Sequence, residues 1–265
     1  FLHGLCCNEQ VWWLAAEKHY DDPTVNYGSR LAEDFGYTAV YVRYNSGLHI
    51  SDNGRRLASL LDELVTAWPV QVEEMALIGH SMGGLVARSA CHVATRSGLR
   101  WPQTVRHTVS LGSPHLGAPL EQVANAASWA LAKLPETRPV AKVLNIRSSG
   151  IKDLRYGYVC DEDWTGYDCD ALWQNRRGDV PLLPAATHFF VGMTLTASPR
   201  HPVGRLLGDL LVLVPSASGI ARGVQRIPFE VENGRHFGRM HHLAVLNHPD
   251  VYDELARWLG AAPRR

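Results

Sequence analysis

The residues whose types and spacing best support chemistry lie in one short stretch, MALIGHSMGG, at Met75–Gly84. Its apolar start predicts a buried strand over Met75–Gly79, and a helix is expected from Met82 to about Thr95, so a G-x-S-x-G pentapeptide occupies the turn between them. Such a tight turn holds Ser81 in a strained backbone conformation with its Oγ free to react. A serine hydroxyl held in this way beside a base is a nucleophile. Without a base, the pentapeptide is only a glycine-rich turn.

A serine nucleophile needs a base to take its proton and an acid to orient that base. Where the serine sits on a strand-to-helix turn of this kind, the acid and then the histidine follow it along the chain. Ser81, Asp209 and His242 satisfy this order, because Asp209 follows a predicted strand and His242 lies between the last predicted strand and the last helix. His241 and His248 compete for the role of base. We favour His242 because it directly precedes an apolar run.

Two backbone N–H groups are expected to form an oxyanion hole, which stabilises the negative charge on an attacked carbonyl oxygen. One belongs to Met82, because the start of a helix directs its N–H groups and the positive end of its dipole outward. The other is assigned to Leu5, which follows a His-Gly pair where the chain can approach a substrate closely. His80 adjoins the serine, but its side chain is expected to point away in a structural role.

The elements that must position these residues alternate between strands and helices. Periodicity and composition predict strands at Met75–Gly79, Thr38–Arg43, Val105–Leu111, His188–Leu195 and Ile227–Val231. Helices are predicted at Tyr27–Phe35, Arg55–Trp68, Leu120–Leu134 and Pro249–Leu259. Loops are predicted at Asn45–Gly54, Ser148–Tyr158 and Gly234–Met240. This alternation implies an α/β protein with a mostly parallel sheet flanked by helices.

The alternation stops between residues 118 and 184, which we interpret as a cap or lid inserted above the sheet. The chain is thus expected to consist of a first core part at 1–117, the cap at 118–184 and a second core part at 185–265. Five aspartates of the cap are interpreted as a solvated face and not as catalytic acids: Asp161, Asp163, Asp168, Asp170 and Asp179. Its tryptophans are interpreted as packing residues, with the lining of an acyl pocket as the alternative: Trp129, Trp164 and Trp173.

Composition excludes several classes of function. The 265 residues are 46% hydrophobic and 20% charged, which is ordinary for a globular protein. Their formal net charge is zero, which argues against nucleic acid as a partner, and no apolar run is long enough for a transmembrane segment. No metal or organic cofactor is expected, because no metal, phosphate or dinucleotide motif occurs. The cysteines are expected to be free thiols, with a Cys160–Cys169 disulfide as the alternative in an exported protein.

Six segments together look like bacterial α/β-hydrolases of the lipase and esterase type: FLHGLCCNE, GHSMGGLVARSA, LGSPHLGAP, IRSSGIKDLRYG, GDLLVLVPSAS and HHLAVLNHPDVYDEL. They resemble the group related to GPI inositol-deacylases and triacylglycerol lipases. The resemblance implies the α/β-hydrolase fold and a carboxylic-ester hydrolase with Ser81 as nucleophile, His242 as base and Asp209 as acid. It also implies that Phe1-Leu2 end a central strand, so the N-terminal strands of the fold are expected to be missing from this chain.

The expected function is hydrolysis of a small-molecule or lipid carboxylic ester through an acyl-enzyme intermediate. An acyltransferase or thioesterase that uses the same three residues is one alternative. A non-catalytic binding protein with this fold is another, although a binder need not keep all three residues. Oligomeric state is left open, and so is the compartment, with the cytoplasm slightly favoured.

Overall fold

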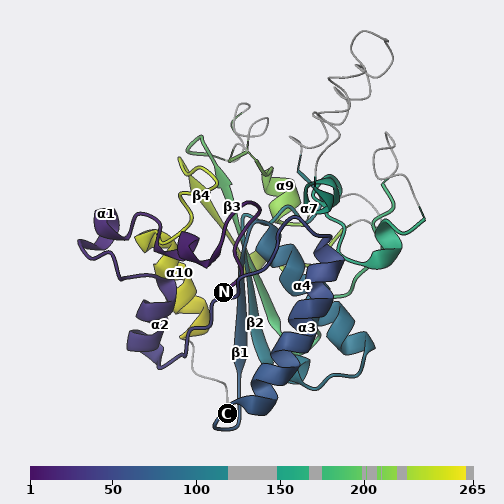
Figure 1. Cartoon of the computed structure of the whole chain (residues 1–265). Helices are drawn as coiled ribbons and strands as arrows, with labels where there is room; N and C mark the ends of the chain where they lie inside the picture. Colours follow the sequence, from purple (N-terminus) through teal and green to yellow (C-terminus); the bar gives the residue numbers. More distant parts are fainter. Residues whose placement is uncertain are drawn as a thin grey trace.

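The computed structural model describes residues 1–118, 148–166, 175–198, 201, 208–209, 211–219 and 226–260. Within them, four strands form one parallel sheet in the order β1-β2-β3-β4 (Figure 1). The strands are β1 (Met75–His80), β2 (Val105–Leu111), β3 (Thr187–Thr194) and β4 (Gly234–Gly238). The longer helices are α2 (Tyr27–Phe35), α3 (Ile50–Ala67), α4 (Met82–Arg96) and α10 (Pro249–Leu259). The shorter ones are α1 (Ala16–Tyr20), α7 (Ser149–Asp153) and α9 (Val214–Ala217), and the 3-10 turns are Glu9–Trp13, Trp101–Thr104, Asp161–Asp163 and Val231–Asn233.

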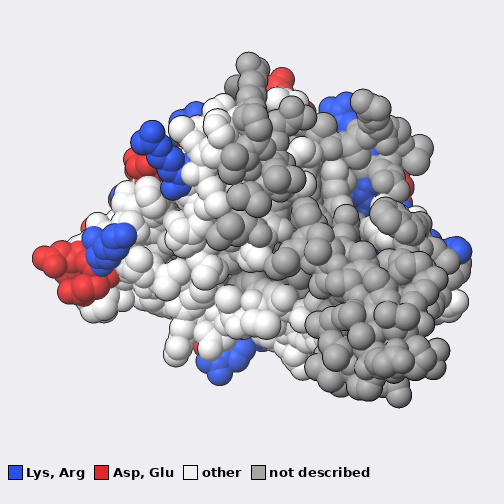
Figure 2. Space-filling view, turned by 90° about the horizontal axis from the view of Figure 1, so that it is seen from above, with Lys and Arg blue, Asp and Glu red and all other residues white. Residues whose placement is uncertain are grey.

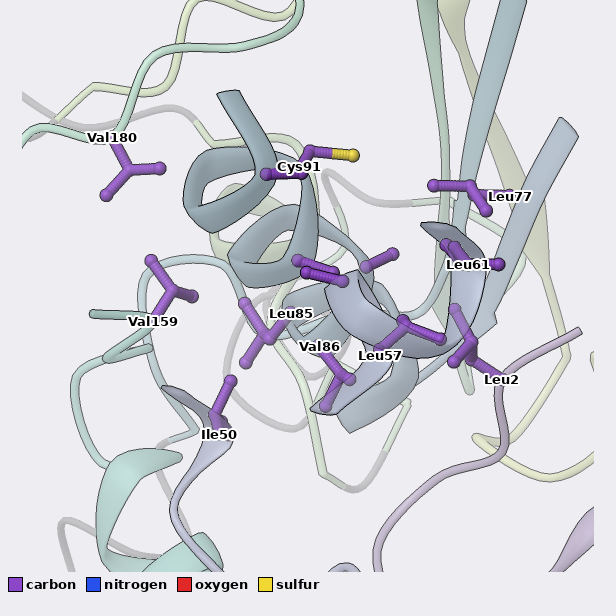
Figure 3. Packing of buried hydrophobic residues seen from close by; sticks show 14 of the residues in the cluster. Leu2, Ile50, Leu57, Leu61, Leu77, Leu85, Val86, Cys91, Val159 and Val180 are labelled. Atoms are coloured by element: carbon purple, nitrogen blue, oxygen red, sulfur yellow. The ribbon is translucent and has the colours of Figure 1, made fainter. Parts of the chain in front are cut away.

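Helices cover both faces of the sheet, with α3 and α4 on one side and α2 and α10 on the other (Figure 1). Successive strand residues point to opposite faces, so Leu77 packs with the α3–α4 cluster and Ile78 packs with the α10 cluster. Figure 3 shows Leu61 of α3 beside Leu77, and Leu57 of the same helix next to Val86 of α4. The burial of both faces agrees with the nearly continuous apolar run in β1, MALIGH, whereas β2 and β4 also contain polar residues. The predicted α/β class and parallel sheet are confirmed.

Several predicted elements are confirmed because their signals are local. Helix α2 coincides with its predicted range, and it begins where the Asn26 side chain accepts hydrogen bonds from the N–H groups of Gly28 and Ser29. Helix α10 also coincides with its predicted range, with Pro249 in its first turn. Strands β1, β2 and β3 agree with prediction to within one residue at each end.

The predicted strand at Thr38–Arg43 is wrong. The segment makes one isolated parallel bridge, between Val42 and Leu2, and Leu2 makes a second one to Gly79 of β1. Phe1 and Leu2 thus lie between the two segments, but two residues are too few to pair with a strand along its length. Beyond them an apolar groove of about 620 Å³ separates residues 38–42 from β1.

The predicted strand at Ile227–Val231 is also wrong, and the loop predicted at Gly234–Met240 contains β4 instead. Ile227 and Phe229 are buried against Phe190 of β3, so their alternation reflects packing and not strand pairing. The paired residues begin at Gly234, where a Cβ would lie 2.2 Å from the Phe190 ring. A glycine that lacks β propensity is therefore needed at this strand end for steric reasons.

Helix α3 begins at Ile50, within the predicted Asn45–Gly54 loop, because a distant carboxylate caps it. Asp153 is buried and accepts a hydrogen bond of 2.7 Å from the N–H of Ile50 and another from the His49 ring. The same aspartate ends α7, a short helix inside the stretch that was predicted to be a loop. One side chain thus fixes the start of α3 and the position of residues 149–153 relative to it.

The prediction that Asp163 belongs to a solvated face is wrong. Its buried carboxylate accepts hydrogen bonds from the N–H groups of Val159, Cys160 and Gly178. Trp164 is a packing residue, since its ring stacks on His49 at 3.8 Å. The predicted helix at Leu120–Leu134 and several predicted positions lie outside the described residues: Trp129, Asp168, Cys169, Asp170 and Trp173. Cys160 is a free thiol.

Replacing Gly79 with alanine should destabilise the protein, because the new Cβ would lie 2.4 Å from the backbone nitrogen of Gly84. We expect the free energy of unfolding to fall by about 1–3 kcal/mol, as for other cases of overpacking. Urea unfolding followed by circular dichroism measures the change. Gly192→Ala in β3 is the matched control, since its nearest neighbouring atom would be 3.6 Å away. Equal losses in the two variants would contradict the steric argument.

Candidate active site

Ser81 lies at the turn between β1 and α4, with a backbone conformation of φ 54° and ψ −122°. A non-glycine residue with this conformation is strained by roughly 1–3 kcal/mol and persists only where its surroundings enforce it. The enforcing contacts are the N–H of Ser81, which donates to Leu111 O in β2 at 2.9 Å, and the close packing of β1 on α4 at Gly79. The strain predicted from the G-x-S-x-G spacing is therefore observed.

Asp209 and His242, 33 residues apart, are joined by a buried hydrogen bond of 2.8 Å between Asp209 Oδ2 and His242 Nδ1. The other carboxylate oxygen accepts from the N–H groups of Leu211 and Val212 at 3.0 and 2.8 Å. The backbones are also joined, since the N–H of His242 donates to Asp209 O at 3.1 Å. The orientation of the imidazole is thus fixed by both its side chain and its backbone.

A cavity of about 400 Å³ brings the serine and the histidine together, since Ser81 and His242 both line it. No hydrogen bond joins Ser81 Oγ to the ring, and among the described residues His242 Nε2 has no partner at all. Such bonds are often long in enzymes without substrate. The cavity therefore contains an imidazole nitrogen with a free lone pair or proton beside a strained serine.

Of the two residues assigned to the oxyanion hole, Leu5 lines this cavity and Met82 directly follows Ser81 in the chain. Met82 is the first residue of α4, where an N–H has no acceptor within the helix. Gly4 allows the chain to come this close, since a Cβ there would lie 3.1 Å from Ser81 Cβ and 3.0 Å from His80 Nδ1. An anion placed next to Ser81 would face the start of a fifteen-residue helix.

The competing histidines do not reach the cavity. The side chain of His241 is exposed, and the Nδ1 of His248 accepts a hydrogen bond from Asp250 at the start of α10. His80 has a role that the sequence did not indicate, because its buried ring lines the cavity and its Nε2 lies 3.2 Å from His242 O. Burial lowers the pKa of His80 to about 3, so its ring stays neutral and can donate to that carbonyl.

The described lining of the cavity contains no Lys, Arg, Asp or Glu, and Asp209 acts on it through His242. Figure 2 looks down on the top of the molecule as drawn in Figure 1, which is the side where the strands end. In the described part of this face, Lys, Arg, Asp and Glu lie mainly around the rim. In the part of the chain that the structure describes, no cluster of His, Cys, Asp and Glu could hold a metal ion. Likewise, none of the described helices is long and apolar enough to cross a bilayer.

Stability should depend on pH through His80. Its pKa of about 3 in the folded protein is lower than the value near 6.5 of an unfolded histidine, so only the unfolded chain takes up this proton as the pH falls below about 6.5. Between pH 6.5 and pH 3, His80 alone should therefore lower the free energy of unfolding by about 1.4 kcal/mol for each unit by which the pH falls. Urea unfolding at pH 7, 6 and 5 measures this slope.

His80→Gln keeps a donor for His242 O but cannot be protonated, so the slope should become shallower by up to about 1.4 kcal/mol per unit. His241→Gln, at an exposed position, is the control and should leave the slope unchanged. If the free energy of unfolding of His80→Gln changed with pH as steeply as that of the native protein, His80 would not be the source of the pH dependence.

The geometry can be compared with known proteins. Residues 2–172 match the family model described as PGAP1-like alpha/beta domain. Among solved structures, the mature lipase BlEst2 of Bacillus licheniformis is similar with a TM-score of 0.59 and 18% identity, over 98% of this chain and 89% of that chain. Its propeptide form gives a TM-score of 0.63 and 17% identity, over 100% of this chain and 50% of that chain. Lipase 1 from Pelosinus fermentans gives a TM-score of 0.51 and 15% identity, over 99% of this chain and 98% of that chain.

A search of curated proteins found no match. At these identities the solved structures show a shared fold, which is the α/β-hydrolase fold predicted from the motifs. The match to the family model is stronger evidence of family membership than the structural similarity is, because it is a match of sequence. It spans well over half of the 265 residues. The chain belongs to the PGAP1-like alpha/beta domain family.

Proposed function

We propose that the protein is a serine hydrolase that cleaves carboxylic esters through an acyl-enzyme intermediate. Ser81 is the nucleophile, His242 the general base and Asp209 the acid that orients it. The observation that supports this most strongly is the buried Asp209–His242 hydrogen bond of 2.8 Å, whose imidazole lines the same cavity as the strained serine. A base that is oriented by a carboxylate beside a strained hydroxyl is the arrangement that serine nucleophiles require.

In the first half of the reaction, His242 Nε2 removes the proton of Ser81 Oγ as that oxygen attacks the ester carbonyl carbon. The carbonyl oxygen becomes an oxyanion that accepts hydrogen bonds from the N–H groups of Leu5 and Met82. Asp209 stabilises the imidazolium through Nδ1. When the tetrahedral intermediate collapses, the bond to the alcohol oxygen breaks and His242 gives its proton to that oxygen. The alcohol leaves, and the acyl group stays on the serine.

The second half repeats these steps with water. His242 takes a proton from a water molecule, the hydroxide attacks the acyl carbon, and the oxyanion is stabilised as before. Collapse breaks the bond to Ser81 Oγ, which recovers its proton from the imidazolium, and a carboxylic acid is released. Loss of one oxyanion donor typically costs on the order of 10²–10³ in rate.

The lining of the cavity favours an uncharged, apolar acyl group. Its described lining contains no Lys, Arg, Asp or Glu, and most of the contact surface comes from aliphatic side chains: Leu5, Ile151, Leu154, Leu211, Val212 and Leu243. Ile151 and Leu154 belong to the segment 118–184, so we propose that this segment is a cap that completes the pocket. The structural neighbours that share the fold are named lipases, which supports esters of lipid-like acids as substrates.

Ser81→Ala should abolish ester hydrolysis, because Ser81 has the only side-chain hydroxyl among the described residues that line the cavity of His242. We expect kcat on a p-nitrophenyl ester to fall at least about 10⁴-fold, as in other enzymes that lose their nucleophile. Labelling of the native protein by a fluorophosphonate probe should disappear in the variant. Ser97→Ala, at the exposed end of α4, is the control and should keep both properties.

Undiminished turnover by Ser81→Ala would refute the nucleophile. Failure of the folded native protein to be labelled would favour a non-catalytic binding protein. Transfer of the acyl group to an added alcohol in preference to water would instead identify an acyltransferase with the same three residues.

The volume of the cavity predicts which acyl chains are accepted. Ile151→Trp should fill part of the cavity, so kcat/KM for p-nitrophenyl octanoate should fall at least about tenfold more than that for the acetate, which corresponds to the cost of losing one or two apolar contacts. Ile151→Val removes only one methylene and should leave the ratio nearly unchanged. A uniform loss for both esters in Ile151→Trp would mean that this wall does not contact the acyl chain.

A further inference from the structure

A second cavity, separate from the one that contains Ser81, lies between the sheet and the buried side of α4. Its volume is about 20 Å³, which is room for one particle of the size of a water molecule. Leu77 of β1 and Gly84 of α4 contribute to its wall. Two basic side chains also line it, Arg88 of α4 and His115 of the loop after β2.

Arg88 and His115 have unused hydrogen-bonding atoms at this cavity. Arg88 is 8% exposed and donates from Nη2 to Val180 O at 2.8 Å, but its Nε and Nη1 have no partner. His115 is 1% exposed, and neither of its ring nitrogens has a partner. The other ring in the wall, His188, is already hydrogen-bonded to Thr108. Unpaired buried groups of this kind are rare in native proteins, so four such atoms at one cavity indicate an occupant.

The charge around the cavity decides what kind of occupant fits. Among the described residues no carboxylate forms an ion pair with Arg88, although a buried guanidinium normally has such a partner. Burial lowers the pKa of Arg88 to about 10, and Arg177 lowers it further while the carboxylates of Asp163 and Asp179 act in the opposite direction, so the side chain is still charged at neutral pH. Burial lowers the pKa of His115 well below its ordinary value, with Arg88 and Arg177 acting in the same direction.

We propose that this cavity binds one small monovalent anion, a halide, between the Nε and Nη1 groups of Arg88 and a ring N–H of neutral His115. Water would satisfy these donors but would leave the guanidinium without a directly hydrogen-bonded anion, since the carboxylates of Asp163 and Asp179 act on it only through space. A phosphate or sulfate, with five heavy atoms, is too large for about 20 Å³. A halide satisfies the donors, gives Arg88 a directly bonded anion and fits the volume.

The site is connected to the fold through the loop that carries His115. The N–H of His115 donates to Ser113 O, and its carbonyl accepts from Arg177 at 2.7 Å. An ion that binds only the folded protein stabilises it by mass action. Halide should therefore raise the thermal stability of the native protein, with saturation at increasing concentration.

Thermal unfolding in sodium bromide against sodium gluconate, at constant ionic strength, tests the proposal. We expect the midpoint to rise by about 2–4 °C as bromide replaces gluconate, which is too large for the cavity. Arg88→Met keeps much of the side-chain volume without the charge and should lose this dependence. Arg96→Met is the matched control, since Arg96 lies on the same helix but pairs with Glu162 at the surface, and it should keep the native dependence.

Equal midpoints in the two salts for the native protein would overturn the proposal, and so would a native bromide dependence in Arg88→Met. Crystals of the native protein in bromide give an answer that does not depend on the folding of Arg88→Met. An anomalous peak within hydrogen-bond distance of Arg88 and His115 supports the site. A water molecule there, without an anomalous signal, overturns it.

Discussion

The close approach of β1 to the start of α4 is the constraint on which the rest of the structure depends. At Gly79 of β1 a Cβ would lie 2.4 Å from Gly84 N of α4, and at Gly83 of α4 a Cβ would lie 2.3 Å from Leu2 O. This contact leaves no room for the turn to relax, so Ser81 keeps its φ of 54°. Because Leu2 is held against the same glycines, residues 3–5 are brought to the serine as well.

The other half of the candidate site is built on a different principle. Asp209 accepts three hydrogen bonds, from Leu211 N, Val212 N and His242 Nδ1, so both oxygens of this buried carboxylate have partners. Three hydrogen bonds then hold His242. Its ring bonds to the Asp209 carboxylate, its N–H donates to Asp209 O, and its carbonyl lies 3.2 Å from His80 Nε2. Steric exclusion thus fixes the serine, while hydrogen bonding fixes the histidine, and the two meet only at the cavity.

Sequence predicted the features that arise from local patterns. The capping side chain of Asn26, the proline in the first turn of α10 and the glycines around Ser81 act within a few residues, so α2, α10 and the turn could be assigned. The failures come from contacts over long distances in the chain. The start of α3 depends on Asp153, about a hundred residues later, and the contact of His80 with His242 spans 162 residues.

Strand prediction failed for a related reason. A strand is defined by its partner, and among the described residues the segment around Val42 is bridged by Leu2 and hydrogen-bonded to Phe1 O. Ile227 and Phe229 show the alternating apolar pattern of a strand, yet they pack against Phe190 without pairing. The segment GRHFG, which has little apolar pattern, pairs with β3 instead. Apolar periodicity reports burial, and burial coincides with strand pairing only where a neighbouring strand exists.

The loop that follows β2 lies between the two cavities, because neighbouring residues of this loop line each of them. At Gly112, with φ 61°, a Cβ would lie 3.4 Å from the ring of His242, and two residues later Pro114 lines the cavity of the serine. His115, the next residue, lines the other cavity together with Arg88 of α4. The loop is held to α9 by Ser216, whose hydroxyl donates to Gly117 O. One short loop thus packs against the imidazole of His242 at Gly112 and forms part of the wall around Arg88 at His115.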